Sequence, residues 1–366
     1  MNAPSYSLNP EPVRWWVVSL VVAVIVFFTP LPAWVIEDFY SRDMYPWLQD
    51  IVTTVTNTLP LAVLDVILIV VAFAVLFRIR RLYYVLRQRG VMDAIWEAFR
   101  RIVRAVCVLA VLFYWAWGFN YRRVPLESII PGGKSPQVTV DMLVSGFSDS
   151  AVLAASLRRM VANDAGNLHT IRLELVEPMN LALKSLGRIP LETPSVPKFS
   201  LVLTPFFRSS GVTGMINPFG LETIVFPDLL PFERPFVVAH EWAHLAGQAD
   251  EAEASAVGWL ACMKGDAVVA YSASLYLIME TARAMPPDVR EKAMARLDAG
   301  VRQDIDAIVE RMTAQSPRVQ ETTSRVYDEY LKANRVEDGT ASYGRALSFI
   351  LSPPFRDALS NYTLTR

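Results

Sequence analysis

The chain has 366 residues, of which 53% are hydrophobic and only 19% are charged. This composition excludes a disordered chain and a collagen-like chain, and it makes a membrane protein the first hypothesis. The net charge of −1 divides into about +4 over residues 1–125 (12 basic, 8 acidic) and −5 over residues 126–366 (23 basic, 28 acidic), and because the basic excess lies in the apolar part, no nucleic-acid partner is expected.

Three apolar stretches within residues 1–125 predict transmembrane helices. Residues 15–36 contain no charged side chain, and such a helix is long enough to cross about 30 Å of hydrocarbon. Residues 59–77 and 102–119 follow, the last ending in aromatic side chains typical of a membrane interface. A cleaved signal peptide is the alternative for the first stretch, but the stretch is too long and no cleavage site follows. Asp65 interrupts the second stretch, where packing against a neighbouring helix or reaching outward is favoured over a proton relay.

The connecting segments predict an orientation. Residues 78–104 carry eight arginines against two acidic side chains, which is typical of a cytoplasmic loop. The segment between the first two stretches is acidic instead, and only Arg122 and Arg123 oppose the assignment. We therefore expect a cytoplasmic N-terminus and a domain of residues 126–366 on the outer side of the membrane.

This outer domain is predicted to be mainly helical. Helical periodicity covers residues 140–163, 173–186, 267–284, 288–315 and 319–334. Two short β-branched runs, residues 199–203 and 222–226, enclose a segment rich in glycine, asparagine and proline, which predicts a small sheet of two or three strands. The fold expected is a three-helix membrane anchor followed by an α+β domain.

The most informative stretch is HEWAH, which runs from His240 to His244. Histidines four residues apart lie on one face of a helix and can bind one metal ion, while the carboxylate of Glu241 can reach a water molecule on that ion. Gly247 can end this helix in the left-handed conformation and let the chain reverse. The pattern predicts a zinc site with Glu241 as general base.

A third ligand is needed, because catalytic zinc usually has three protein ligands and one open position. The only other histidine, His169, is distant in sequence, so a carboxylate is favoured. Asp250, Glu251 and Glu253 are candidates, and the geometry of a helical hairpin slightly favours Glu253. Those that are not ligands would serve the N-terminus of the second helix, where negative charge is favourable.

Several motifs together resemble a family of bacterial multi-pass membrane proteins with zinc-peptidase-like sites. They are HEWAH with a glycine three residues later, EAEASAVGWLAC, WGFNYRRVPL, INPFGLE and YLKANRVEDGTASYGRAL. More remotely, HExxH followed by E-x-x-A-[DN] is similar to gluzincin peptidases of the HtpX and CAAX-prenyl-protease types. The resemblance implies a gluzincin-like domain of a bacterial membrane protein, with Glu251 as the third ligand. Together with the predicted orientation, this places the domain in the periplasm, anchored in the cytoplasmic membrane. Ser255 stands where those peptidases have Asp or Asn to orient a histidine ligand.

The first functional hypothesis is a membrane-anchored zinc metallopeptidase that cleaves a peptide or protein on the outer side. His240, His244 and Glu251 would hold Zn²⁺, and Glu241 would accept a proton from water and pass it to the leaving amine. A second donor for the developing oxyanion is expected from Tyr343, with Arg345 and Tyr330 as alternatives.

An extended substrate would lie along residues 211–217, although the glycines there are equally explained as turn residues. Two other functions are possible. The first is a noncatalytic membrane protein with a structural metal site or a partner-binding outer domain. The second is a zinc hydrolase that acts on a nonpeptide amide.

Overall fold

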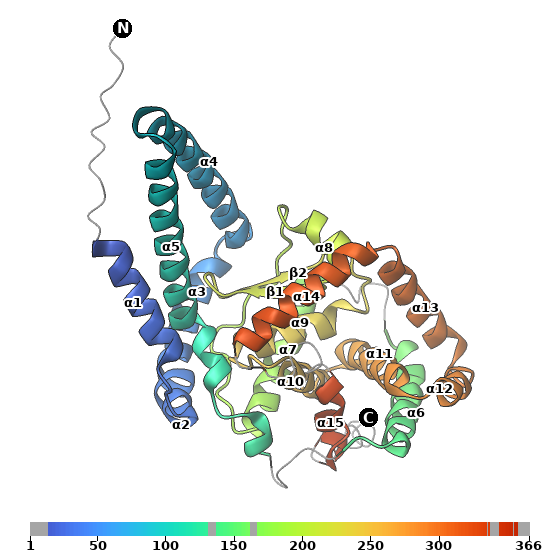
Figure 1. Cartoon of the computed structure of the whole chain (residues 1–366). Helices are drawn as coiled ribbons and strands as arrows, with labels where there is room; N and C mark the ends of the chain where they lie inside the picture. The colour runs from blue at the N-terminus through green and yellow to red at the C-terminus, as the bar shows by residue number, and fades with distance from the viewer. Residues whose placement is uncertain are drawn as a thin grey trace.

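The computed structural model describes residues 14–130, 137–161, 167–334, 336, 344–353 and 355–357. Its first part contains α1 (Arg14–Phe28), α2 (Ala33–Val35), a π-helical segment η1 (Ile36–Met44), α3 (Tyr45–Asn57), α4 (Val63–Arg89), α5 (Val91–Ala116) and two short 3₁₀ segments, η2 (Gly118–Arg122) and η3 (Leu126–Ser128). The second part contains α6 (Val140–Arg158), α7 (Leu168–Ser185), α8 (Thr204–Ser210), β1 (Gly214–Asn217), β2 (Glu222–Val225), α9 (Arg234–Leu245), α10 (Glu251–Met263), α11 (Ala267–Ala284), α12 (Pro287–Met294), α13 (Ala299–Thr313), α14 (Pro317–Ala333) and α15 (Ala346–Ile350). The described chain is therefore mainly helical, as the sequence predicts (Figure 1).

The small sheet has two antiparallel strands, β1 and β2, with Ile216 opposite Thr223. A strand over residues 199–203 is a wrong prediction, because this segment turns and leads into α8. The carboxylate of Asp65 fixes the turn by accepting hydrogen bonds from the backbone N–H groups of Leu201 at 2.7 Å and Val202 at 3.4 Å. The helix predicted over residues 288–315 is two helices, because Asp298 caps a new N-terminus at α13.

The core of the body surrounds α10, whose residues are all buried. Helix α10 packs against α7, α9, α11 and α15, and α11 packs against α6. Small side chains allow this close packing, most clearly at Gly258, where an added Cβ would lie 2.9 Å from the backbone nitrogen of His240. The two helices α9 and α10 are therefore in backbone contact distance, which fixes their relative position tightly.

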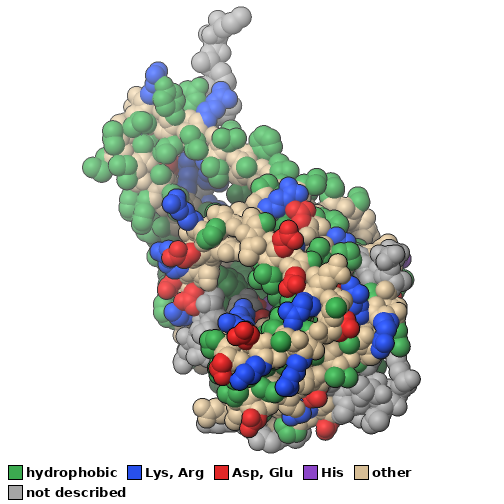
Figure 2. All heavy atoms as spheres, turned by 90° about the vertical axis from the view of Figure 1, so that its right-hand side faces the viewer, with side chains coloured by type: hydrophobic (Ala, Val, Ile, Leu, Met, Phe, Trp, Pro, Cys, Tyr) green, Lys and Arg blue, Asp and Glu red, His purple; other side chains and the backbone are tan. Residues whose placement is uncertain are grey.

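Helices α1, α4 and α5 form an extension that rises from the body, with α5 packed against both of the others (Figure 1). Their outward side chains are mostly apolar and exposed, including Val70 at 60%, Phe73 at 68% and Ile102 at 63%. Figure 2 shows hydrophobic side chains over this extension and basic ones near its free end, whereas charges of both signs cover the body. The extension thus exposes far more apolar surface than a protein in water usually does.

The described helices offer one or two candidate membrane spans and not the three predicted. Helix α6 is long and apolar enough to cross a membrane, and α1 with the continuation through α3 gives a second candidate that is bent by 106°. The predicted span 15–36 is broken because Pro30 and Pro32 follow the end of α1. Helices α4 and α5 are not among the candidates, because every stretch of 18 residues in them carries at least three charged side chains. These include Asp65 and the arginines of residues 78–104. Helix α6 itself packs in the body.

The segment between α1 and α4 is embedded in the body rather than lying apart from it. Tyr40, Tyr45 and Leu48 belong to the same buried cluster as the residues of α9 and α10. Two carboxylates join the start of α4 to the body. Glu222 accepts hydrogen bonds from the N–H groups of Val63 and Leu64, and Asp65 accepts those of Leu201 and Val202. Asp65 therefore has the structural role expected, although its partner is a loop and not a helix. The boundary near residue 125 stays a prediction, and these contacts cross it.

Candidate metal centre

A helical hairpin, α9 followed by α10, builds the centre. Pro235 suits the first turn of α9, where its missing N–H is not needed. The helix ends at Leu245, and Gly247 has a φ of +82°, the left-handed conformation that reverses the chain. Asp250 then caps α10 by accepting hydrogen bonds from the N–H groups of Ala252 and Glu253. This turn brings the start of α10 opposite the last two turns of α9.

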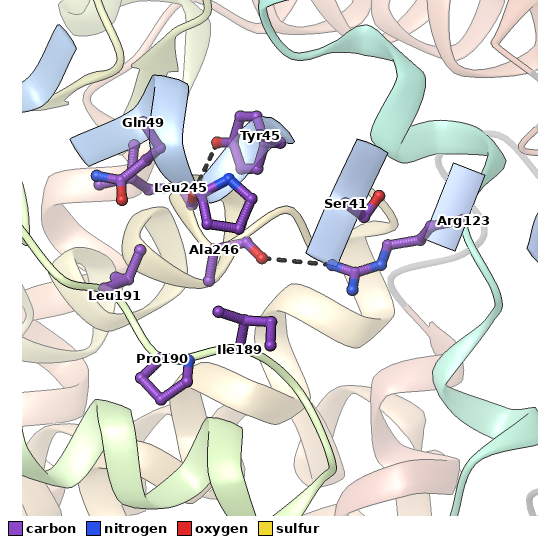
Figure 3. A pocket seen from close by; sticks show the side chains of 10 residues that line it. Ser41, Tyr45, Gln49, Arg123, Ile189, Pro190, Leu191, Leu245 and Ala246 are labelled. Carbon is purple, nitrogen blue, oxygen red and sulfur yellow. Dashed lines mark hydrogen bonds between the residues drawn. The ribbon is translucent and has the colours of Figure 1, made fainter. Parts of the chain in front are cut away.

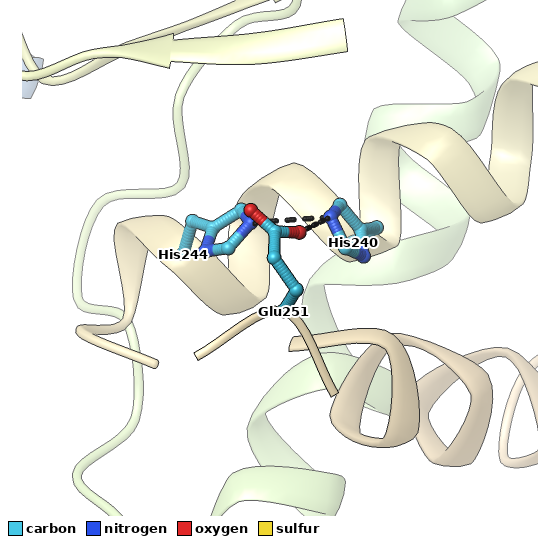
Figure 4. Close-up of side chains that lie close together, drawn as sticks. All are labelled: His240, His244 and Glu251. Atoms are coloured by element: carbon cyan, nitrogen blue, oxygen red, sulfur yellow. Dashed lines mark hydrogen bonds and ion pairs between the residues drawn. The ribbon is translucent and has the colours of Figure 1, made fainter. Parts of the chain in front are cut away.

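The hairpin brings three predicted ligands together, His240, His244 and Glu251 (Figure 4). The two Nε2 atoms lie 3.1 Å apart, and Oε2 of Glu251 lies 3.2 Å from Nε2 of His240 and 3.4 Å from Nε2 of His244. Tetrahedral zinc with bonds of about 2.0–2.1 Å places neighbouring ligand atoms about 3.3 Å apart. The three atoms thus form one face of a tetrahedron of the size that zinc requires.

Hydrogen-bond partners on the far side of each imidazole direct Nε2 toward this face. Nδ1 of His244 lies 2.7 Å from the carbonyl oxygen of Gln248. Because a carbonyl only accepts, Nδ1 carries a proton, and in the neutral imidazole the lone pair on Nε2 points toward this face and can bind a metal. Nδ1 of His240 lies 3.2 Å from the hydroxyl of Ser255. The hydroxyl of Ser255 is therefore placed to orient the imidazole of His240.

The phenol of Tyr327 on α14 donates a hydrogen bond to Oε1 of Glu251. The other oxygen, Oε2, faces the histidines, is buried, and accepts no hydrogen bond within the described part of the chain. A buried carboxylate oxygen without a donor is rare, because its desolvation is not compensated. Two imidazole nitrogens and one such oxygen are a ligand set that zinc takes, so the residues present fit this ion.

The charges of the site attract a cation. Burial raises the pKa of Glu251, but the neighbouring His244 and His240 outweigh it and hold the pKa well below its usual value. Burial lowers the pKa of His244, but the Glu251 carboxylate outweighs it and raises the pKa to about 9. The carboxylate is thus ionised in the site and stabilises positive charge beside it, whether a proton or a metal ion carries that charge.

Glu241 lies beside β1 and is 4% exposed. A Cβ added at Gly214 would lie 2.7 Å from Oε1 of Glu241, so this strand passes the carboxylate at a point without a side chain. Burial raises the pKa of Glu241, and the nearby Glu251 adds to the effect, while His240 and His244 oppose it. A carboxyl with a raised pKa is suited to accept and return a proton.

The other candidates from the sequence lie elsewhere. Glu253 accepts a hydrogen bond at 2.7 Å from the N–H of Leu126 and is not in the cluster. Asp250 caps α10 and pairs with Arg345 at 2.6 Å. Tyr330 stacks on Tyr327 one turn away on α14. Two predicted residues remain: His169 is exposed in the first turn of α7, and Tyr343 lies outside the described residues.

Sequence reasoning missed Tyr327 and Gln248. Tyr327 is separated from Glu251 by 76 positions, and only its place three residues before Tyr330 on an amphipathic helix marks it. Gln248 acts through its backbone carbonyl, which no side-chain pattern can reveal. The sequence does indicate that the chain reverses after Gly247, and this reversal brings the backbone of Gln248 back toward His244.

Comparison with known proteins identifies the family but not an activity. No curated protein and no solved structure matches the chain. One family matches residues 40–351, a range that covers α9, α10, α14 and most of the N-terminal helices, and its description is "Protein of unknown function (DUF3810)". Since this range takes in most of the chain, including the HEWAH hairpin, the protein belongs to the DUF3810 family.

Proposed function

We propose that this protein is a membrane-anchored zinc metallopeptidase. The observation that carries the proposal is the face formed by Nε2 of His240, Nε2 of His244 and Oε2 of Glu251, with separations of 3.1–3.4 Å. Three protein ligands leave one position of a tetrahedral ion for water, which distinguishes a catalytic centre from a structural one. Among the described residues no fourth His, Cys, Asp or Glu joins the cluster, which favours the catalytic alternative.

Zinc bound there would lower the pKa of a water molecule and polarise a substrate carbonyl. Glu241 follows His240 directly and lies under β1, where it accepts the proton of the attacking water. The buried setting that raises its pKa also makes it a competent acid, so the same carboxyl returns the proton to the leaving amine. Its neighbour Gly214 leaves the space above the carboxylate free of a side chain.

A second donor is needed for the negative charge that develops on the carbonyl oxygen. Tyr327 is a candidate for this donor, because its phenol hydroxyl contacts Oε1 of the ligand Glu251. Within this proposal it takes the role expected of Tyr343. The edge of β1 is the proposed site for an extended peptide, because backbone groups of a substrate pair readily with a free strand.

The membrane anchor is supported by the surface of α1, α4 and α5. Large apolar side chains on these helices are exposed, and the arginines of residues 78–104 gather around the α4–α5 turn (Figure 2). Apolar flanks with a basic far end are typical of helices that cross a bilayer with that end in the cytoplasm. The body with its metal centre then lies on the opposite, periplasmic side of the membrane.

The experiment compares Glu241→Gln with the wild-type protein in detergent or bilayers. We expect zinc content to be unchanged and cleavage of a peptide library to fall by at least about a hundredfold, because the proton acceptor is lost while the ligands stay. Tyr327→Phe should lower kcat with zinc still bound, whereas Tyr330→Phe, its stacked neighbour, serves as the control for packing. Undiminished cleavage by Glu241→Gln would refute the proposed mechanism.

A further inference from the structure

The carboxyl end of α9 is held by side chains that come from the N-terminal part of the chain, residues 14–125. A helix leaves its last four carbonyl groups without partners inside the helix. At this end the indole N–H of Trp117 donates to the carbonyl of His244 at 3.0 Å, and the phenol of Tyr45 donates to the carbonyl of Leu245 at 2.7 Å. Two consecutive carbonyl groups, including that of a ligand residue, are thus bonded by the N-terminal part.

Arg123 extends this series to the turn. Its guanidinium donates to the carbonyl of Ala246 at 3.3 Å and to the carbonyl of Gly247 at 3.1 Å. Figure 3 shows Tyr45 bonded to Leu245 and Arg123 bonded to Ala246, and all four residues line one small pocket. Donors from α3 and from the two residues that flank η2 therefore contact four successive carbonyl groups, from His244 to Gly247.

These donors are themselves fixed in place. Tyr45, Trp117 and Arg123 are each no more than 7% exposed. The carboxylate of Glu37 accepts two hydrogen bonds of 2.9 Å from Arg123 and two more, of 3.0 and 3.1 Å, from Arg188. A buried carboxylate shared by two guanidinium groups is a rigid support, because each charge is compensated by several hydrogen bonds.

The position of these contacts matters for the metal ligands. The turn at Gly247 and Gln248 sets the direction in which the chain leaves α9, and therefore where Glu251 lies relative to the histidines. The carbonyl of Gln248 also holds Nδ1 of His244. A shift of the turn would move two of the three ligand atoms at once, and misplacement on the scale of an ångström strongly weakens a metal site.

We propose that Trp117, Tyr45 and Arg123 are positioning residues of the metal centre, so that the N-terminal part of the chain sets the geometry of the zinc ligands. The inference rests on the proposed zinc site. It makes the N-terminal part a component of the site, and any displacement of α3 or of the residues that flank η2 is transmitted to the turn between the ligands.

The experiment measures zinc affinity of the full chain in detergent by competition with a chelating dye. Trp117→Phe keeps an aromatic ring and removes the donor to His244, and Tyr45→Phe removes only the hydroxyl. We expect about a tenfold weaker affinity for each and up to about a hundredfold for the double variant, as for residues that orient ligands. Trp115→Phe and Tyr83→Phe, at side chains that are 48% and 50% exposed, are matched controls.

Thermal unfolding with and without zinc separates positioning from a purely structural role. A positioning role predicts that the variants gain less thermal stability from added zinc than the controls do, and that Co²⁺ bound in place of zinc shows an altered visible spectrum. Equal affinities and equal zinc-dependent shifts in variants and controls would overturn the inference, even if the metal-free variants melt earlier. A wild-type chain that binds zinc no better than His240→Ala would instead overturn the zinc site itself and the inference with it.

Discussion

Two helical hairpins of this protein both reverse at a glycine with a positive φ angle, and they differ in what surrounds them. Helices α4 and α5 are joined at Gly90, and α9 and α10 meet through a turn that contains Gly247, with φ angles of +89° and +82°. In α4, the buried residues are Asp65 and Val85, whereas every residue of α10 is buried. A glycine in the left-handed region thus reverses the chain in both places, and the environment decides the composition of the helices.

The two hairpins differ in what stabilises them. The α9–α10 hairpin is fixed by close packing, which Gly258 allows, and by the buried side chains of both helices in one hydrophobic cluster. The α4–α5 hairpin has few protein partners and exposes branched apolar side chains, which are favourable only in an apolar solvent. The first hairpin is specified by protein contacts and the second, in our proposal, by the bilayer.

The largest effect is expected for a charge placed in α10. Val257→Asp buries a carboxylate without a partner at a side chain that is 0% exposed. Such a charge costs at least about 3–5 kcal/mol, a large fraction of a stability of about 5–15 kcal/mol, so the body should lose its cooperative thermal transition. Val326→Asp, 66% exposed on α14, is the control and should melt like the wild type. A normal transition for Val257→Asp would refute the packing described for α10.

The corresponding change in the other hairpin tests the bilayer. Val70→Asp alters a side chain that is 60% exposed on α4. In water the change should be nearly neutral, but inside a membrane a charged side chain at mid-helix costs about 3 kcal/mol, so the integrated fraction of the protein should fall. Alkaline extraction of membranes measures that fraction, with Val326→Asp as the control. If the two variants are retained equally, the extension does not lie in the bilayer.

A smaller effect is expected at the glycines. Gly258→Ala forces α9 and α10 apart, because the new Cβ would lie 2.9 Å from the backbone nitrogen of His240, and should cost about 1–3 kcal/mol and weaken zinc binding. Gly90→Ala meets no atom within 4 Å, but its φ of +89° makes alanine strained by about 1–3 kcal/mol. If both variants lose similar stability but only Gly258→Ala binds zinc more weakly, the zinc site depends on the α9–α10 hairpin and not on the α4–α5 hairpin. A loss of zinc affinity in Gly90→Ala would contradict this difference between the two hairpins.

The sequence predicted the part of the site that depends on helical periodicity. The spacing of His240 and His244 placed both on one face of α9, and Gly247 correctly marked the end of that helix. The choice between Glu251 and Glu253 stayed open, because two residues so close in one helix point in different directions and only the turn determines which faces the histidines. In the structure Glu251 joins them and Glu253 bonds to Leu126.

Long-range contacts were beyond the reach of pattern reasoning. Trp117 and Tyr45 contact α9 across 127 and 200 positions of the chain. The acidic segment after α1 was expected to be a loop, but it is helical and its aromatic side chains lie in the core. A mixture of charged and aromatic residues also suits an amphipathic helix that packs one face on the body. The predicted spans showed the apolar character of the region but overlooked the proline break after α1 and the arginines that enter α5.

Ser255 gives the centre an unusual charge balance. A divalent ion held by Glu251, with Glu241 beside it, would be neutralised by these two carboxylates. The hydroxyl beside His240 adds no further charge, whereas an aspartate at position 255 would leave a surplus negative charge and a more basic imidazole. In the proposed zinc site, the serine would therefore keep the ion a stronger electron acceptor and hold it less tightly, so the protein would respond to zinc supply over a higher concentration range.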